Sequence, residues 1–278
     1  MIPPIASRFV AGESAAEALE HVESLNDRGV AGILNLLGEH YGERAAADAD
    51  ADAYRALVGD IGDADADACV SVKPSQVGLG LGADVFEENL ARIVSRASED
   101  DVFVWVDMED HTTTDATLDA YERFARETDG GVGVCVQANL RRTPDDLERL
   151  AALPGKVRLV KGAYDEPDDV AYRDGGRVDA QYRDCLDYMF REFDGGIAVG
   201  SHDPAMIERA LELHDEHGTD FEFQMLMGVR EDAQFDLADS YDVYQYVPYG
   251  GKWFAYFSRR VMEREENLRF ALRAVIGR

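Results

Sequence analysis

The sequence is poor in positive charge, and lysine in particular is scarce. Its 278 residues include 28 Lys plus Arg against 56 Asp plus Glu, a formal net charge of −28, and the only lysines are Lys73, Lys156, Lys161 and Lys252. Proteins that bind nucleic acid or anionic membranes by electrostatics need an excess of basic residues. We therefore exclude nucleic acid as a partner. A large negative charge is associated with halophilic proteins, so we expect the chain to need molar salt for full stability.

Cysteine and long apolar runs are also scarce. Cys69, Cys135 and Cys185 are odd in number and show no Cys-x-x-Cys spacing, so the sequence implies neither a disulfide framework nor a zinc cluster. No apolar run approaches the ~18 residues that suggest a membrane span. Residues 1–9 lack the cationic and apolar regions of a secretory signal. These features predict a cytoplasmic protein without a structural metal.

The apolar residues are concentrated in short segments that recur along the chain. Hydrophobic residues make up 46% of the sequence, enough to fill the core of one large domain. Most segments are continuous runs, which is typical of parallel strands covered on both faces. The predicted strands are 30–37, 69–73, 102–107, 132–137, 157–161, 197–200, 221–226 and 243–247.

Helical patterns lie between these strands, with start signals such as Asp84, Asp115, Pro144 and Pro204. Eight strands alternating with helices predict an α/β fold, a (βα)8 (TIM) barrel formed by a single domain over residues 1–278. An extra N-terminal helix is expected over 13–27 and a long final helix over 253–275. The structural alternative is a doubly wound open sheet, which the lack of Gly-x-Gly-x-x-Gly after the first strand weakens.

Two acidic tracts, 48–53 and 63–68, both read Asp-Ala-Asp-Ala-Asp-Ala. They lack the glycine and the glutamate that an EF-hand calcium loop requires at fixed positions. We expect a solvated acidic connection there, around a short helix at 54–58.

In a barrel of this class the active site lies at the carboxyl ends of the strands. Polar side chains follow every predicted strand, among them Lys73 after the second and Lys161 after the fifth. A lysine that points into the barrel mouth must be paired or functional, because burying an unpaired charge is costly. Asp110, after the third strand, is equally well explained as a helix cap.

Two further groups suit anionic ligands. His202 precedes a helix start at Asp203-Pro204, where free backbone N–H groups can bind a phosphate such as that of a nucleotide cofactor. Tyr256 lies three and four residues before Arg259 and Arg260, so all three can share one helix face and clamp a carboxylate beside an aromatic ring. The residues alone thus predict a barrel enzyme for a small carboxylate substrate.

Eight strand-end motifs, taken in order, resemble those of proline dehydrogenase, the flavin-dependent family of monofunctional enzymes and of bifunctional bacterial proline utilisation proteins. The resemblance extends from about Leu36 to Leu272. The motifs are 71–76 (SVKPSQ), 107–110 (DMED), 136–138 (VQA), 158–164 (RLVKGAY), 201–203 (SHD), 222–226 (EFQML), 246–250 (YVPYG) and 256–260 (YFSRR).

The resemblance implies a distorted (βα)8 barrel that holds FAD at its mouth. This barrel would oxidise L-proline to Δ1-pyrroline-5-carboxylate, the first step of proline catabolism, by hydride transfer from proline C5 to FAD N5. Lys73, Arg259 and Arg260 would hold the proline carboxylate. The substrate ring would lie against Tyr164, Leu226, Tyr246 and Tyr256. Asp107 would orient the cationic groups, and Glu39 would pair with Arg259. The implied flavin contacts are Asp107, Gln137, Arg158, Val160, Lys161, Gly162, Ala163, Ser201 and His202.

The family passes its electrons to a membrane quinone, so the resemblance also implies at least transient contact with the inner face of the cell membrane. Hydroxyproline stays open as an alternative substrate, and no sequence signal indicates an oligomeric state.

Three other interpretations use the same residues. A metal-dependent barrel hydrolase would use Asp107, Glu109, His111, His202 and Asp203 as ligands. A Schiff-base aldolase would use Lys161 as its nucleophile. A carboxylate-binding module without catalysis is the third.

Overall fold

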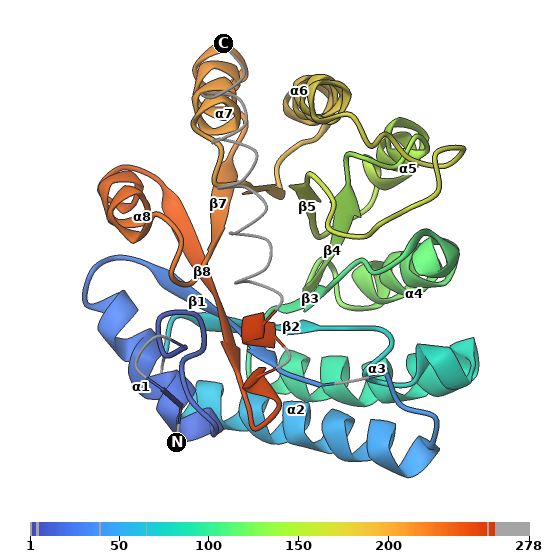
Figure 1. Ribbon diagram of the computed structural model, residues 1–278, viewed down its shortest axis with the longest axis vertical. Helices are drawn as coiled ribbons and strands as arrows, with labels where there is room; N and C mark the ends of the chain where they lie inside the picture. The colour runs from blue at the N-terminus through green and yellow to red at the C-terminus, as the bar shows by residue number, and fades with distance from the viewer. Residues whose placement is uncertain (1, 4–5, 39, 65, 255, 259–278) are drawn as a thin grey trace.

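The computed structural model describes residues 2–3, 6–38, 40–64, 66–254 and 256–258. Among these residues, eight parallel strands close into a barrel in the order in which they occur in the chain (Figure 1). The last strand pairs with the first over six residue pairs, which completes the closure. The strands are β1 (Ala31–Leu36), β2 (Ala68–Val72), β3 (Val104–Val106), β4 (Val132–Gln137), β5 (Lys156–Val160), β6 (Ile197–Gly200), β7 (Phe221–Leu226) and β8 (Asp242–Tyr249). The predicted barrel is confirmed, and the open-sheet alternative is wrong.

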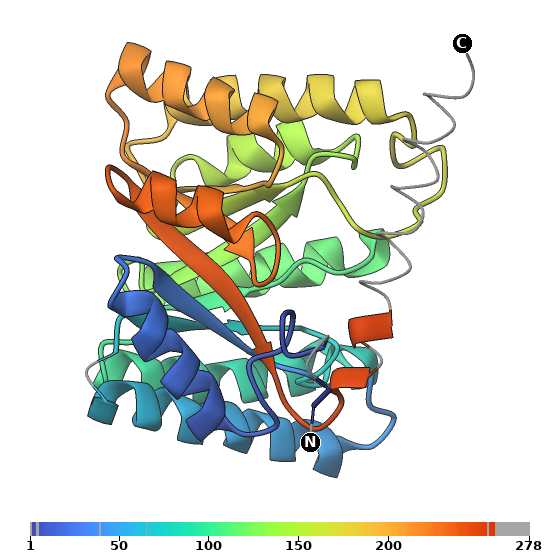
Figure 2. The same cartoon turned by 60° about the vertical axis from the view of Figure 1, so that its left-hand side comes forward.

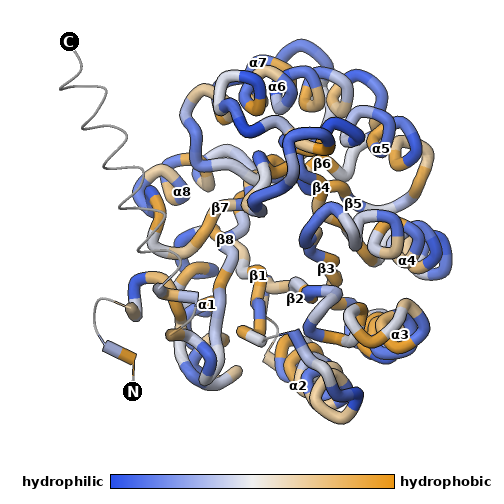
Figure 3. Tube along the Cα trace, turned by 45° about the vertical axis from the view of Figure 1, so that its right-hand side comes forward, coloured by the Kyte–Doolittle hydropathy of each residue, from blue (hydrophilic) through white to orange (hydrophobic). Residues whose placement is uncertain are grey.

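Helices surround the barrel on its outer side (Figures 1 and 2). Figure 3 shows hydrophilic residues on the outward-facing turns of the upper helices. The helices are α1 (Ala15–Asn26), α2 (Arg44–Ala64), α3 (Ala83–Glu99), α4 (Thr114–Glu127), α5 (Thr143–Leu150), α6 (Gly175–Glu192), α7 (Pro204–His217) and α8 (Glu231–Ala238). Two 3-10 turns, η1 (Leu79–Leu81) and η2 (His111–Thr113), lie in the loops after β2 and β3.

The extra N-terminal helix is α1, which precedes the first strand as predicted. Ser14 caps it, and its side chain accepts from the backbone N–H of Glu17 while the Glu17 carboxylate accepts from the N–H of Ser14. This reciprocal capping box satisfies two donors that the first turn would otherwise leave unpaired. Of the predicted final helix, the described residues from Trp253 to Ser258 are helical, and the rest lies outside the described residues.

The first acidic tract, 48–53, does not form the predicted solvated connection. It lies inside α2, a helix of 21 residues. Alanine has the highest helix propensity, and the apolar residues of this segment recur every three or four positions, so they form one buried stripe. The stripe consists of Ala47, Ala51, Tyr54, Leu57, Val58 and Ile61. The aspartates between them stay partly or fully exposed, so the helix carries its charge on the solvent side.

The helix between the seventh and eighth strands, α8, was not among the helical patterns found in the sequence. It has only eight residues, and Gln234 is its one buried residue among those described. Phe235, Leu237 and Ala238 pack only partly buried against the core, so this short helix has too few apolar positions for hydrophobic periodicity to reveal it. It completes the alternation of strands and helices around the barrel.

The inward-facing residues of β6 are small. Ala198 belongs to a cluster in the barrel interior that also contains Ile33, Cys69 and Trp105. Two residues further on, a Cβ added to Gly200 would lie 2.9 Å from the carbonyl oxygen of Leu159. Since β6 contributes no bulk, long side chains of its neighbours β5 and β7 can meet across it inside the barrel.

The three cysteines are buried and free of disulfides, as the sequence predicts. No helix within the described part of the chain is both long and apolar enough to cross a membrane.

Candidate active site

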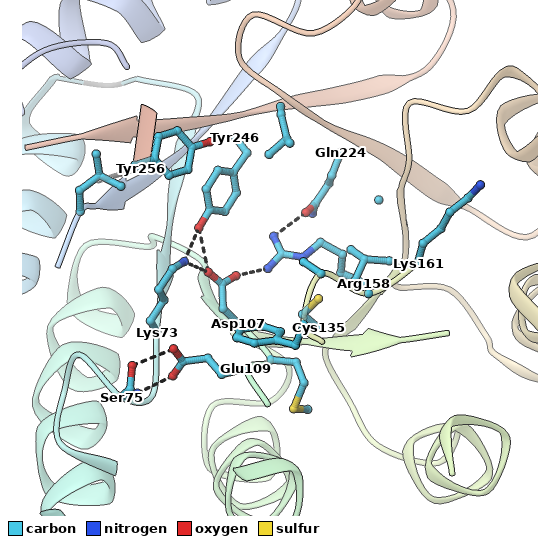
Figure 4. Close-up of a pocket in the computed structure, with 18 of the residues that line it drawn as sticks. Lys73, Ser75, Asp107, Glu109, Cys135, Arg158, Lys161, Gln224, Tyr246 and Tyr256 are labelled. Atoms are coloured by element: carbon cyan, nitrogen blue, oxygen red, sulfur yellow. Dashed lines mark hydrogen bonds and ion pairs between the residues drawn. The ribbon is translucent and has the colours of Figure 1, made fainter. Parts of the chain in front are cut away.

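A cavity of about 800 Å³ opens at the carboxyl ends of the strands (Figure 4). This volume is in the upper part of the roughly 300–1,000 Å³ range typical of small-molecule and cofactor sites. Most of the residues that the sequence predicts for the site line it. Of the predicted set, the lining includes Lys73, Asp107, Arg158, Val160, Lys161, Gly162, Ala163, Tyr164, Ser201, His202, Leu226, Tyr246 and Tyr256.

The carboxylate of Asp107, just after β3, is the centre of the polar contacts in this cavity (Figure 4). It accepts from Lys73 Nζ at 2.6 Å, from the Tyr246 hydroxyl at 2.8 Å and from the Ser71 hydroxyl at 2.7 Å. A guanidinium nitrogen of Arg158 also pairs with it. These donors come from three other strands or their ends, so closure of the barrel is what brings them together. Asp107 thus pairs with both cations.

The two cations determine the protonation state of this centre. Burial alone would raise the pKa of Asp107, but the charges of Lys73 and Arg158 outweigh it and hold the pKa well below its usual range. Burial would likewise lower the pKa of Lys73, yet the ion pair with Asp107 raises it. Burial and the Asp107 charge together raise the pKa of the Tyr246 hydroxyl far above its usual value. At neutral pH the centre therefore carries one carboxylate, two cations and a neutral phenol.

Arg158 points from β5 into the barrel interior, and only 4% of it is exposed. Its second guanidinium nitrogen donates to the side-chain oxygen of Gln224 at 2.9 Å. The guanidinium carbon lies 4.9 Å from the centre of the Trp105 ring, within range of a cation–π interaction. Arg158 is therefore fixed from three sides below the cavity.

Lys161 is paired on the side of the cavity formed by α6 and α7. Its ammonium donates to Asp179 at 2.5 Å and to Asp203 at 2.7 Å. Burial would lower the pKa of Lys161, but these two carboxylates raise it. A Schiff-base lysine needs a lowered pKa to act as a nucleophile, so the shift runs against the aldolase interpretation.

The start of α7 differs from the anion site expected there. Asp203 caps the helix, and its side chain accepts from the backbone N–H of Ala205 at 3.0 Å. The carboxylate thus occupies the position that a phosphate would need at this helix end. His202 lies beside it, and its Nε2 accepts from the backbone N–H of Leu226 at 3.1 Å.

The five side chains of the proposed metal site are engaged separately. Glu109 accepts from the backbone and the hydroxyl of Ser75 at 2.6 and 2.7 Å, and His111 pairs with Glu166. Asp110 caps the turn η2, which confirms its alternative role. Among the described residues no three His, Cys, Asp or Glu side chains are grouped to hold a metal.

The remaining predicted residues fall into two groups. Gln137 does not line the cavity but lies behind it, where it donates to the carbonyl of Glu109 at 2.8 Å and accepts from the backbone of Ala163 at 3.4 Å. Glu39, Arg259 and Arg260 lie outside the described residues.

Some residues of the site were missed from the sequence. Ser71 lies two residues before Lys73, and Cys135 lies two before Gln137, so strand periodicity places each pair on one face and could have found them. Lys252, which follows β8, also lines the cavity. The scarcity of lysine in this chain could have indicated it as a site residue.

Fold and site together define a (βα)8-barrel enzyme with two cations held around a buried carboxylate at its mouth. A family model described as proline dehydrogenase matches residues 18–273. The chain belongs to the proline dehydrogenase family, and its reaction is the oxidation of proline to Δ1-pyrroline-5-carboxylate.

Individual proteins agree with this assignment. The chain is 39% identical to proline dehydrogenase of Deinococcus radiodurans over 282 residues, which cover 98% of this chain and 90% of that protein. It is 34% identical to proline dehydrogenase 1 of Bacillus subtilis over 275 residues, with the same shares covered. A crystal structure of proline utilization A from Bdellovibrio bacteriovorus, inactivated by N-propargylglycine, matches with a TM-score of 0.85 at 24% identity. That match covers 93% of this chain and 32% of the other, and it shows the shared fold.

Proposed function

We propose that this chain oxidises L-proline with FAD, by hydride transfer from proline C5 to flavin N5, and that the cavity at the barrel mouth holds both molecules. The observation that carries this proposal is the arrangement of Lys73, Asp107, Arg158 and Tyr246, two paired cations and a neutral phenol that share one carboxylate in the cavity wall. Members of this family are generally FAD-dependent.

The substrate carboxylate requires a cation that stays charged. Lys73 meets this requirement because its ion pair with Asp107 raises its pKa, and its side chain lines the cavity. The hydroxyl of Tyr246 accepts from the same ammonium at 3.0 Å, which fixes its direction. Arg259 and Arg260 complete the clamp in our proposal, with Glu39 as the partner of Arg259. Guanidinium groups suit this task because they bind carboxylates through two parallel hydrogen bonds.

The residues of the cavity fit a flavin. Gly162 has φ +113°, and a Cβ there would meet the buried side chain of Asn139, so this stretch of wall is bare backbone on which a planar ring can lie. The Asn139 side-chain oxygen is buried without a hydrogen-bond partner among the described residues. A positive charge, Arg158, is fixed beside the cavity. We propose that the flavin is held by Asp107, Gln137, Arg158, Val160, Lys161, Gly162, Ala163, Ser201 and His202.

When bound, the flavin supplies the redox chemistry by accepting the hydride. The protein orients the substrate and provides the electrostatic field. The clamp fixes the carboxylate, and Tyr164, Leu226, Tyr246 and Tyr256 lie against the apolar ring, so C5 has one orientation. Arg158 is positively charged at all pH values of interest, and a fixed cation stabilises negative charge that develops nearby. The substrate amine must be neutral before hydride loss, so the rate should fall at acid pH.

We further propose that the electrons pass to a quinone, which would bring the protein at least transiently to the inner face of the cell membrane. This proposal depends on the resemblance to the family. We also propose that residues 1–278 form one domain, a barrel closed by β1–β8. Oxygen consumption in the presence of membrane vesicles, compared with a soluble quinone analogue, tests the acceptor.

The first experiment is an absorption spectrum of the protein purified in molar salt, recorded before and after anaerobic addition of L-proline. We expect flavin bands that bleach on addition. Flavin bands that persist would contradict proline as the substrate, and a colourless protein that also fails to take up FAD would contradict the cofactor. Hydroxyproline in a parallel sample measures the substrate preference.

The clamp is tested by Arg259→Met. We expect a strong rise in the KM for proline with FAD content unchanged, because the substitution removes a carboxylate contact and no flavin contact. An unchanged KM would place this side chain away from the substrate.

A further inference from the structure

A line of polar contacts continues from Arg158 down the barrel interior, away from the cavity. Arg158 donates to the side-chain oxygen of Gln224 at 2.9 Å, and the side-chain nitrogen of Gln224 donates to Glu222 at 2.6 Å. The other carboxylate oxygen of Glu222 pairs with Lys156. Arg158, Gln224 and Glu222 are each only 4% exposed. The line therefore connects the cavity to the opposite end of the barrel, where Lys156 is partly exposed.

The geometry of three adjacent strands makes this line possible. Lys156 and Arg158 are two residues apart on β5, and Glu222 and Gln224 are two apart on β7, so each pair points into the barrel. In the register of the sheet, Arg158 lies beside Ala198 of β6, and Ala198 lies beside Glu222. The small side chain of Ala198 leaves room for the longer residues to meet.

The chemistry of Glu222 fixes the orientation of the Gln224 amide. An ionised carboxylate can only accept hydrogen bonds, and a guanidinium can only donate them. Between these two groups, the amide has one arrangement that satisfies both: its nitrogen faces Glu222 and its oxygen faces Arg158. In the reverse arrangement, the amide nitrogen would face the donors of Arg158 and the amide oxygen would face the acceptors of Glu222.

Arg158 depends on this orientation because each of its terminal nitrogens has a separate anchor. One nitrogen pairs with Asp107 and the other donates to Gln224. Two anchors fix the plane of a guanidinium, whereas one anchor allows it to rotate about that contact. Lys156 supports the arrangement from below, because its ammonium pairs with Glu222 and lies 5.3 and 5.6 Å from the ring centres of Phe103 and Tyr244.

We propose that Glu222 is a positioning residue for proline oxidation, which acts through Gln224 on the guanidinium of Arg158. The proposal rests on the proposed place of Arg158 beside the flavin. Glu222 lies at the far side of Gln224 from the cavity and is not among the described residues that line it.

Glu222→Gln tests the proposal, because it keeps the shape of the side chain but removes its acceptor-only character. Misplacing an electrostatic contact costs rate rather than binding, so we expect kcat to fall about tenfold, with the KM for proline within about twofold of the wild type. The reduction potential of the bound flavin should fall, because a displaced cation stabilises the reduced form less. A purely structural role would leave that potential unchanged.

A double-mutant cycle shows whether Glu222 acts through Gln224. In a Gln224→Leu background, we expect Glu222→Gln to change kcat less than about twofold, because the connecting amide is gone. An equal loss in both backgrounds would overturn the proposal. If Glu222→Gln does not fold, Glu222→Gln combined with Lys156→Met removes both charges and allows the same comparison. Glu122→Gln on α4 is the matched control, because Glu122 pairs with Arg126 and Arg149 on the surface, and this variant should match the wild type.

A crystal structure of Glu222→Gln provides a readout that does not depend on the flavin. We expect the guanidinium of Arg158 to keep its contact with Asp107 and to move away from Gln224. An unmoved guanidinium with normal kcat would overturn the proposal. If the flavin bands of the wild type do not bleach with proline while Arg158 moves in the variant, the proposed function fails, but the control of the Arg158 guanidinium by Glu222 stands.

Discussion

Replacement of Asp107 by asparagine should destabilise the protein more than any exposed charge substitution. Asp107 is only 8% exposed and accepts from Ser71, Lys73, Arg158 and Tyr246. Lys73 and Arg158 bind different oxygens of this carboxylate, so the asparagine amide keeps an acceptor for one cation and directs its NH2 group at the other. Both cations then remain at the barrel mouth without a counter-charge.

The magnitude follows from burial. Removing one partner of a buried ion pair typically costs about 3–5 kcal/mol. The side chain of Lys73 is 28% exposed and can partly rehydrate, so we expect the lower end of this range. A loss of about 3 kcal/mol corresponds to a fall in Tm of roughly 5 °C for a protein of this size.

Urea unfolding at pH 7 in constant molar salt measures this change, with the m-value showing whether unfolding stays two-state. Asp115→Asn is the control, because Asp115 is 75% exposed on the surface and pairs with Arg142. The control should lose less than about 1 kcal/mol, and added salt should reduce its effect further, whereas the buried contacts of Asp107 should be screened much less. A loss for Asp107→Asn no larger than that of the control would refute the account of this centre.

Three further predictions follow from particular residues. Gly162→Ala should cost about 2 kcal/mol and lower FAD content, because a Cβ at φ +113° strains the backbone and meets Asn139; normal stability and normal FAD content would contradict this. The destabilisation by Asp107→Asn should be constant from about pH 5 to pH 9 and narrow in acid, because a carboxylate with a depressed folded-state pKa stabilises the fold above its unfolded pKa and loses this effect as the pH falls. A destabilisation by Asp107→Asn that grows as the pH falls would contradict this expectation. Thermal unfolding should shift upward strongly from dilute buffer to molar salt if the net charge of −28 is a salt adaptation, and full stability without salt would contradict the halophilic interpretation.

Much of the fold followed from local sequence patterns. All eight predicted strands overlap observed strands, because most are the continuous apolar runs that a parallel sheet covered on both faces requires. The helices α2 and α8 were the exceptions. In α2 the buried stripe is partly made of alanines within an acidic tract, and in the short helix α8 a few apolar residues pack only partly buried against the core. Hydrophobic periodicity therefore had too weak a signal at both places.

The sequence by itself also determined which residues lie at the barrel mouth, since polar side chains after successive parallel strands must gather at one end. It could not determine how they pair. Only the closed barrel brings Lys73, Arg158 and Tyr246 to the carboxylate of Asp107. Lys73 and Tyr246, for example, are 173 positions apart in the chain. The line from Arg158 to Lys156 likewise depends on strand register and on the small Ala198. Such contacts depend on distances across the sheet, which a linear pattern does not contain.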